Sequence, residues 1–301
     1  MDIKTFKELI DALNEAGTAD IYSFVQKNEA EFLEISVEEF RRRVKNILNT
    51  MKEAVSNGLK TNELSKSGLS GENTALVKEA IEALKLDGAR FSTLSPVQKK
   101  VIIYTLSVIE ENARMGKIAA CPTAGSCGIV PGVLIALGEE LSLPNEKLVD
   151  ALILAGIIGE IVSSKMALAG AVAGCQAECG VAAAMAAGAV CFILGGRNED
   201  ILNACALSLK NILGLTCDPV SGLVEVPCVK RNVFMAFNAL VAAELSLFGV
   251  KSKIPLDDVV DAMKETGELM AVSLKESSEA GLAKTKTGIE IEKFLKEKFT
   301  R

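Results

Sequence analysis

Hydrophobic residues recur every three to four positions along most of the chain, which is the period of an amphipathic α-helix. The clearest case runs from Phe40 to Val55, between charged and polar positions. Ser36 and Glu39 form a capping box ahead of this run, and Gly58 closes it. The pattern therefore predicts a long helix after Ser36.

Other helix signals follow the same period. Ser95 followed by Pro96 is typical of a helix start and predicts a helix that runs toward Met115. Strand patterns are nearly absent, the best being 222–226. The sequence thus predicts a mostly α-helical fold, with further helices at 3–13, 76–84, 198–214, 228–249, 257–270 and 289–299 and loops at 61–73 and 281–288.

The polarity of the chain changes near residue 117. Residues 1–116 form charged amphipathic helices, whereas Ala, Gly, Ile and Val dominate from Ile118 to about Val250. The longest uncharged run, Cys179 to Gly196, has the minimum length for a membrane span and directly follows Glu178. We therefore expect one helical domain over 1–301, in which buried Ala/Gly-rich central helices and irregular loops within 117–301 are wrapped by the polar helices.

The composition excludes several kinds of chemistry. The 301 residues carry a net charge of -6, and aromatic residues make up 4%, so nucleic acid is not the expected partner. The chain contains no histidine. It cannot by itself supply a Ser-His-Asp triad, a histidine zinc site or a haem histidine ligand.

Eight cysteines are the remaining reactive residues. Because the N-terminal residues lack the continuous apolar stretch of a signal peptide, we expect a cytoplasmic protein with reduced thiols. Each cysteine is then a core residue, a metal ligand or a reactive thiol. Cys191 and Cys205 lie within regular apolar helices and are assigned to the core.

Three segments of the apolar region carry polar or reactive residues, which cost a few kcal/mol each when buried without a partner. In ACPTAGSCGIVPGVL, residues 120–134, a loop of small residues precedes an apolar helix. Its backbone amides, beside the hydroxyls of Thr123 and Ser126, suit a carboxylate or a phosphate. In GCQAECG, residues 174–180, Cys175 and Cys179 fall on one helical face.

The third segment is GLTCDPVSGLVEVPCVKRN, residues 214–232, in which ten residues separate Cys217 from Cys228. The cysteine spacings match neither a zinc ribbon nor the compact ferredoxin motifs, but an iron-sulfur cluster needs only thiolates that the fold brings together. Three thiolates would leave one iron open, as a Lewis acid for a substrate hydroxyl and carboxylate. Packing in the core is the alternative for any single cysteine.

Together these segments resemble a known family. With SKSGLSG at 65–71 and GLAKTKTG at 281–288, they are similar, in order, to the α chains of bacterial iron-sulfur-dependent L-serine dehydratases. The resemblance covers nearly the whole chain and is most specific at 213–232. It implies a 4Fe-4S cluster held by Cys175, Cys217 and Cys228, with the fourth iron left for substrate. Packing is then the role left for Cys121, Cys127 and Cys179.

The resemblance also implies roles for other residues. The PTAGS loop would bind the substrate carboxylate, and Lys66 is a candidate for carboxylate contact or acid-base catalysis. Three polar residues beside the cysteines would orient the cluster. The substrate-binding candidates are Thr123, Ala124, Gly125 and Ser126, and the cluster-orienting candidates are Asp218, Lys230 and Asn232.

The implied reaction is elimination of water from L-serine, which gives aminoacrylate and then pyruvate and ammonia. Two-chain members of this family work with a separate β chain that carries a regulatory domain. This agrees with the composition, since a chain without histidine must take any imidazole base from elsewhere. We therefore expect L-serine or a similar small amino acid and a β chain as partners, with neither nucleic acid nor membrane.

One segment departs from the family. SSKMALAG, residues 163–170, stands where the family usually has a stretch rich in Asn and Ser, so threonine, cysteine or another amino acid with a β leaving group stays an alternative substrate. Elimination with pyridoxal phosphate on Lys165 would require alternating strands and helices, which the sequence lacks. A non-catalytic helical subunit is the other alternative, in which the three cysteines need not meet.

Overall fold

The computed structural model describes residues 3–18, 20–87 and 92–300, and no β-strand occurs among them. An isolated bridge pairs Cys217 with Lys275. The predicted mostly α-helical fold is confirmed. The helices are α1 (Phe6–Glu15), α2 (Ile21–Phe32), α3 (Val37–Gly58), α4 (Asn73–Asp87), α5 (Pro96–Ala113), α6 (Ile129–Glu140), α7 (Asn145–Lys165), α8 (Gly170–Ala173), α9 (Val181–Ile193), α10 (Asn198–Lys210), α11 (Cys228–Leu247), α12 (Leu256–Leu269) and α13 (Lys286–Phe299).

Two predicted helix starts are confirmed by their caps. The Ser36 side chain accepts a hydrogen bond from the backbone amide of Glu39 at the start of α3, over 3.1 Å. At the start of α5, Ser95 and Gln98 form a reciprocal capping box behind Pro96. Side chains that satisfy the free amides of the first turn thus fix where these helices begin.

Residues 222–226, the best of the scarce strand patterns, form no strand, because positive φ angles at Ser221 and Gly222 turn the backbone and the described residues hold no strand to pair with it. Two local predictions are wrong. The GLAKTKTG segment is largely helical, with a 3-10 turn at Gly281–Lys284 followed by the start of α13. Helix α10 has Arg197, not Asn198, as its N-terminal cap and ends at Lys210.

Helix α9 lies at the centre of the molecule and packs against α6, α7, α10 and α11. Small side chains allow this close packing: a Cβ at Gly188 would lie 2.5 Å from Ile158 Cδ1 and 3.0 Å from Cys205 Sγ. By length and composition, residues 176–193 could cross a membrane, but 89% of that window is buried inside the protein. Its role as a core helix agrees with the sequence prediction.

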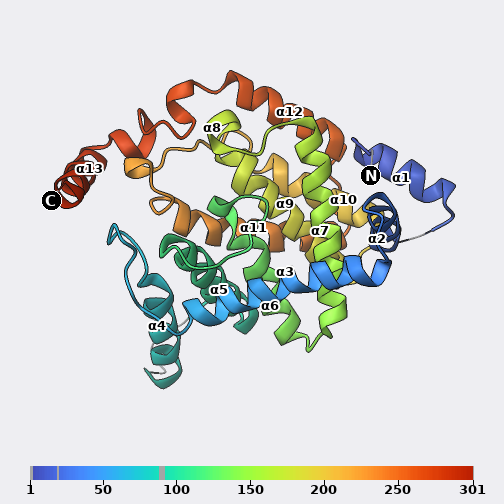
Figure 1. The fold of residues 1–301 in the computed structure, drawn as a ribbon, viewed down its shortest axis with the longest axis horizontal. Helices are drawn as coiled ribbons and strands as arrows, with labels where there is room; N and C mark the ends of the chain where they lie inside the picture. Colours follow the sequence, from blue (N-terminus) through green and yellow to red (C-terminus); the bar gives the residue numbers. More distant parts are fainter. Residues whose placement is uncertain (1–2, 19, 88–91, 301) are drawn as a thin grey trace.

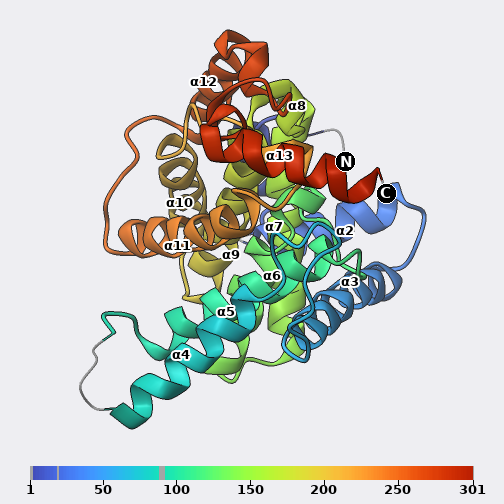
Figure 2. The same ribbon diagram turned by 90° about the vertical axis from the view of Figure 1, so that its left-hand side faces the viewer.

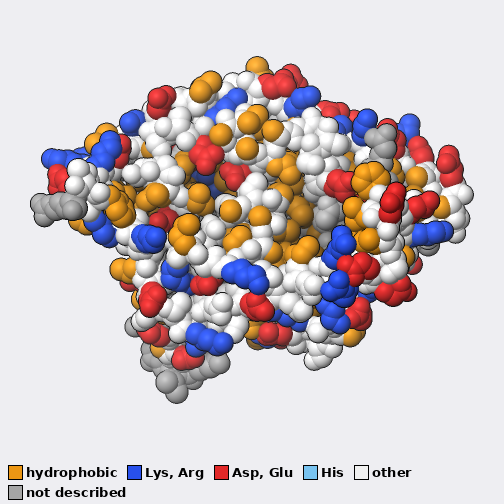
Figure 3. Space-filling view, viewed as in Figure 1, with side chains coloured by type: hydrophobic (Ala, Val, Ile, Leu, Met, Phe, Trp, Pro, Cys, Tyr) orange, Lys and Arg blue, Asp and Glu red, His pale blue; other side chains and the backbone are white. Residues whose placement is uncertain are grey.

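The polar helices surround this core (Figure 1). Helices α2 and α3 lie along one side, α12 and α13 cross the opposite side, and α4 projects from the body (Figures 1 and 2). Helix α1 lies beside α12, where Asp257 accepts hydrogen bonds from the Phe6 and Lys7 amides. The loop between α3 and α4, residues 61–72, reaches toward α13. On the face shown in Figure 3, hydrophobic side chains gather near the middle of the molecule. The loops that carry the reactive residues lie where this core meets α12 and α13.

Candidate active site

Three cysteines from two distant segments influence one another electrostatically at one end of the core. Cys175 precedes a π-helical turn at Gln176–Gly180, Cys217 follows α10, and Cys228 begins α11. All three side chains are buried. Each thiol lies close enough to the others to influence their ionisation. Burial, followed by the charge of Cys175, raises the pKa of Cys228 to about 12 and that of Cys217 further still.

A fourth thiol belongs to the same group. Cys179 lies one turn after Cys175, and its thiol donates a hydrogen bond to Cys175, which lowers the pKa of Cys175 and raises that of Cys179. The Arg231 guanidinium adds a smaller lowering effect on Cys175. Cys179 is fully buried and its Sγ also lies 4.0 Å from the carbonyl oxygen of Gly125. The positive charge of Arg231 therefore favours ionisation of Cys175.

The Glu178 carboxylate lies between the PTAGS loop and Cys217. The Thr123 hydroxyl donates to its Oε2 over 2.7 Å, and the Cys217 thiol lies 3.9 Å from its Oε1. Burial raises the pKa of Glu178, and the hydrogen bond from Thr123 offsets only part of that effect. Ligand atoms of Glu178, Cys217 and Glu276 all lie within 4.8 Å of one another. This carboxylate was not among the predicted site residues.

Asn232 connects the PTAGS loop to the start of α11. Its fully buried side chain donates to the carbonyl oxygens of Gly125, over 2.8 Å, and Cys228, over 3.0 Å. Its Oδ1 accepts from the backbone amide of Gly128 over 3.1 Å. The amide thus fixes the distance between the loop and Cys228, which suits the cluster-orienting role expected for it.

The two hydroxyls of the PTAGS loop are already engaged. Thr123 donates to Glu178, and the buried Ser126 hydroxyl contacts Thr123 Oγ1 at 3.1 Å and the Cys121 carbonyl oxygen at 3.4 Å. Within the described residues, the backbone amides of Ala124 and Gly125 have no such acceptor. These amides, not the hydroxyls, are therefore the free donors of the loop.

Asp218 ties the cysteine loop to the near-terminal segment. It is buried, its Oδ1 lies 3.2 Å from Arg231 Nη2, and its Oδ2 accepts from the Leu282 amide over 2.9 Å. Gly281 has a φ of +61°, and a Cβ there would lie 2.4 Å from Asp218 Oδ2. The GLAKTKTG segment thus supports the site through its backbone. Lys230, by contrast, is exposed.

The SKSGLSG loop is held by one carboxylate. Glu225, three residues before Cys228, is buried and accepts hydrogen bonds from the hydroxyls of Ser65, Ser67 and Ser70. This places the loop against the cysteine segment, although Lys66 within it is exposed. On the outer side, Lys298 of α13 donates to the carbonyl oxygens of Lys66 and Ser67 over 3.0 Å.

Lys165, the residue considered for a Schiff base, is held by ion pairs. Its Nζ lies 2.8 Å from Asp261 Oδ1 and 3.4 Å from Asp257 Oδ1. Burial disfavours the charged form, but the two carboxylates outweigh it and raise the pKa of Lys165. A lysine held in the charged form is not a nucleophile, so the geometry does not favour the pyridoxal phosphate alternative.

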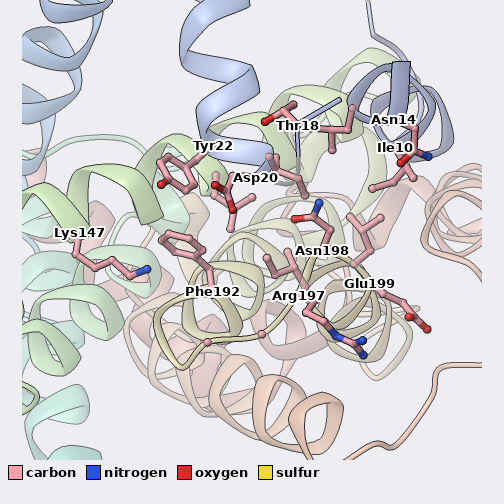
Figure 4. Close-up of a pocket in the computed structure, with 17 residues that line it drawn as sticks. Ile10, Asn14, Thr18, Asp20, Tyr22, Lys147, Phe192, Arg197, Asn198 and Glu199 are labelled. Atoms are coloured by element: carbon pink, nitrogen blue, oxygen red, sulfur yellow. The ribbon is translucent and has the colours of Figure 1, made fainter. Parts of the chain in front are cut away.

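A cavity of about 730 Å³ lies away from these thiols. It opens between the α1–α2 segment and the turn between α9 and α10 (Figure 4). The Lys147 ammonium on its wall lies 3.6 Å from the centroid of the Phe192 ring, and the Tyr22 ring packs on the same phenyl group. Since no cysteine lines it, this cavity is separate from the candidate active site.

The residues at the thiol group suit an iron-sulfur cluster. Cluster irons take thiolate ligands, and thiols with raised pKa values in a buried position gain from a bound cation that removes their protons. Arg231 supplies a positive charge beside Cys175, and the Cys217–Cys228 loop is irregular enough to wrap around a group. The donor chemistry therefore fits Cys175, Cys217 and Cys228 as ligands.

Comparisons with known proteins agree along nearly the whole chain. A family model described as serine dehydratase alpha chain matches residues 17–283. A protein of Bacillus subtilis described as a probable L-serine dehydratase, alpha chain, is 40% identical over 96% of this chain and 94% of its own. The L-serine dehydratase alpha chain of Peptoniphilus asaccharolyticus is 36% identical over 98% of this chain and 99% of its own. An L-serine dehydratase of Streptomyces coelicolor is 34% identical over 93% of this chain but 60% of its own length.

Proposed function

Because the chain belongs to the serine dehydratase alpha chain family, we propose that it is the catalytic subunit of an L-serine dehydratase. The enzyme is a lyase that removes the α-proton and the β-hydroxyl of L-serine as water. The aminoacrylate that remains becomes an imine, which water hydrolyses to pyruvate and ammonia. The observation that supports this proposal most strongly is the buried Asn232 side chain, which donates to the carbonyl oxygens of both Gly125 in the PTAGS loop and Cys228. The thiols of Cys175, Cys217 and Cys228 also influence one another's ionisation.

We propose that these three cysteines hold a 4Fe-4S cluster. When bound, the cluster supplies a Lewis acid that makes the hydroxyl a better leaving group. Asn232 and Asp218 fix the backbone on either side of the cysteine loop. Arg231 offsets negative charge at Cys175, which favours its thiolate form.

The chain's own residues bind the rest of the substrate. The free amides of Ala124 and Gly125 donate hydrogen bonds to the substrate carboxylate, since backbone amides in a loop of small residues suit an anion. Glu225 holds the Lys66 loop beside the cysteine segment, which keeps Lys66 a candidate for acid-base catalysis. Because the chain has no histidine, we propose that an imidazole base comes from a partner β chain, as the relatives' alpha-chain names suggest.

Single alanine substitutions test the ligand set. After anaerobic reconstitution with iron and sulfide, Cys175→Ala, Cys217→Ala and Cys228→Ala should each keep less than about a tenth of the parental cluster, because each removes one ligand. Cys191→Ala is the matched control, since that thiol is fully buried within α9 away from the site. Iron and sulfide contents that were equal in all four variants would overturn the assignment.

The SSKMALAG segment bears on which amino acid is preferred. Lys165 points to α12 through its ion pairs, Met166 is buried in the core, and Ala167 and Ala169 are exposed. Gly170 lies next to the site. A Cβ at Gly170 would lie 2.8 Å from Cys217 Sγ. The segment therefore leaves L-serine as the proposed substrate, and keto-acid formation from L-threonine and L-cysteine measured beside L-serine tests this choice.

A further inference from the structure

We propose that the Glu178 carboxylate binds the α-ammonium group of the substrate and thereby selects amino acids over hydroxy acids of the same shape. This inference rests on the proposed function, since it concerns the same site. The proposed function gives partners to the carboxylate and the hydroxyl of L-serine but none to its α-ammonium group, and Glu178 supplies that partner.

An amino acid presents three different groups to the site. Its carboxylate needs donors, its hydroxyl needs the group that helps it leave, and its ammonium needs an acceptor. An ammonium group that leaves water without an anionic or strong acceptor partner costs several kcal/mol. A half-buried site for L-serine therefore requires a carboxylate close to the thiols and the PTAGS loop.

Two other acidic residues near the site, Asp218 and Glu225, already have partners. Asp218 pairs with Arg231 and accepts from the Leu282 amide, and Glu225 accepts from three serine hydroxyls. Glu276, whose ligand atom lies within 4.8 Å of that of Glu178, stands at the exposed edge of the site, where water solvates its charge. Glu178 takes part in none of the ion pairs found among the described residues. Its partners are neutral: the Thr123 hydroxyl, the Cys217 thiol and the Gly170 amide.

The position of Glu178 matches the shape of the substrate. Its Oε2 faces the PTAGS loop, where a Cβ at Gly125 would lie only 3.0 Å away, and its Oε1 faces Cys217. An α-carbon bound at this point has the loop amides on one side and the thiols on the other. Three separate contacts, to the loop amides, to Glu178 and toward the thiols, also distinguish the L enantiomer from the D enantiomer.

The test compares two ligands that differ only at the α-ammonium group. α-Methyl-L-serine has no α-proton and cannot undergo the elimination; the matching enantiomer of 3-hydroxy-2-methylpropanoate has hydrogen in place of its ammonium. Affinities are measured by calorimetry, anaerobically, on the reconstituted chain with the partner chain present. Glu178→Gln should weaken binding of α-methyl-L-serine at least about tenfold, because it removes a charge-assisted hydrogen bond. Binding of the propanoate should change by less than about threefold.

A second variant separates the effect of the Glu178 charge from the effect of the hydrogen bond that orients it. Thr123→Val removes the hydroxyl that orients Glu178 but keeps the carboxylate. It should preserve most of the preference for α-methyl-L-serine over the propanoate, whereas Glu178→Gln abolishes it. Iron content and the visible spectrum of both variants should equal those of the parent, since neither residue is a proposed ligand.

The outcomes distinguish this inference from the function on which it rests. Equal losses for both ligands in Glu178→Gln, or no loss for either, would overturn the role of Glu178 in a protein that still binds iron and forms pyruvate. A parent chain that binds no iron and forms no pyruvate would overturn both proposals.

Discussion

At the scale of single residues, three glutamates hold together segments that are far apart in the sequence. Glu178 joins the PTAGS loop to the thiols, Glu225 holds the SKSGLSG loop, and Glu110 holds the start of α4. Each accepts several hydrogen bonds, which offsets the cost of burying its charge. These three glutamates thus hold loops in place by accepting hydrogen bonds from residues distant in the sequence.

Glu110 should make the stability of the fold depend on pH. It is fully buried in α5 and accepts from the amides of Gly71, Asn73 and Thr74 and from the side chains of Asn73 and Thr74. Burial opposes ionisation, but these hydrogen bonds outweigh it and lower the pKa of Glu110. A carboxylate with a lowered pKa stabilises the fold above its unfolded-state pKa, and this contribution is lost as pH falls through the folded-state value.

Glu110→Gln should therefore lower the free energy of unfolding by about 3 kcal/mol at pH 7, because backbone donors would face an amide nitrogen. The difference from the parent should shrink as pH falls below about 4.3, the ordinary pKa of an unfolded glutamate, and through the lowered folded-state pKa. Urea unfolding followed from pH 7 down through this range measures it, with the exposed Glu79→Gln as control. A difference that did not depend on pH would contradict this account of Glu110.

At the scale of elements, the loop at 61–72 is held from two sides. Glu225 binds three of its serine hydroxyls from within, and Lys298 of α13 binds two of its carbonyl oxygens from outside. Neither partner could be predicted from the loop sequence, because both contacts join residues more than 150 positions apart. The loop is therefore an ordered part of the site although Lys66 is exposed.

Glu225→Ala should release this loop. Three buried hydroxyls would lose their acceptor, so the loop would open more often and trypsin should cleave after Lys66 at least about tenfold faster than in the parent. Glu63→Ala, an exposed substitution in the same loop, is the control. Limited proteolysis followed by mass spectrometry measures the rate. Unchanged cleavage in Glu225→Ala would show that other contacts hold the loop.

The sequence predicts those helices whose position is set by local features, namely capping residues and hydrophobic periodicity. Caps and periodicity locate α3 and α5 closely, and the uncharged run at 179–196 is correctly assigned to the core. The prediction fails at 281–288, where the backbone follows tertiary contacts such as that between Asp218 and Leu282. Arg231 follows Cys228 by three residues in the sequence, but only the fold shows that its positive charge lowers the pKa of Cys175.

At the scale of the whole molecule, an apolar helical core carries its chemistry at one end, where loops meet α12 and α13. Glu178 could be noticed in the sequence as a charge among alanines, yet its contact with Thr123 depends on the packing of the whole core. The same packing brings Cys217 and Cys228 within electrostatic reach of Cys175, although they follow it by 42 and 53 positions in the sequence. The family resemblance, not spacing, singled out these three among the eight.

The absence of histidine is also a property of the whole chain and bears on how the enzyme is assembled. If the imidazole base comes from a partner, the reconstituted chain alone should bind the cluster but form pyruvate at least about a hundredfold more slowly than with the partner chain, which is the usual contribution of one acid-base group. Pyruvate formation measured with increasing partner chain tests this. Full activity without the partner would contradict it.

The most direct test of the central claim is the iron and sulfide content of the purified chain, determined anaerobically together with its visible spectrum. The account predicts a brown protein with about four irons and four sulfides per chain, as a 4Fe-4S cluster requires. A colourless chain that binds no iron after reconstitution would contradict it and return Cys175, Cys217 and Cys228 to the packing of the core.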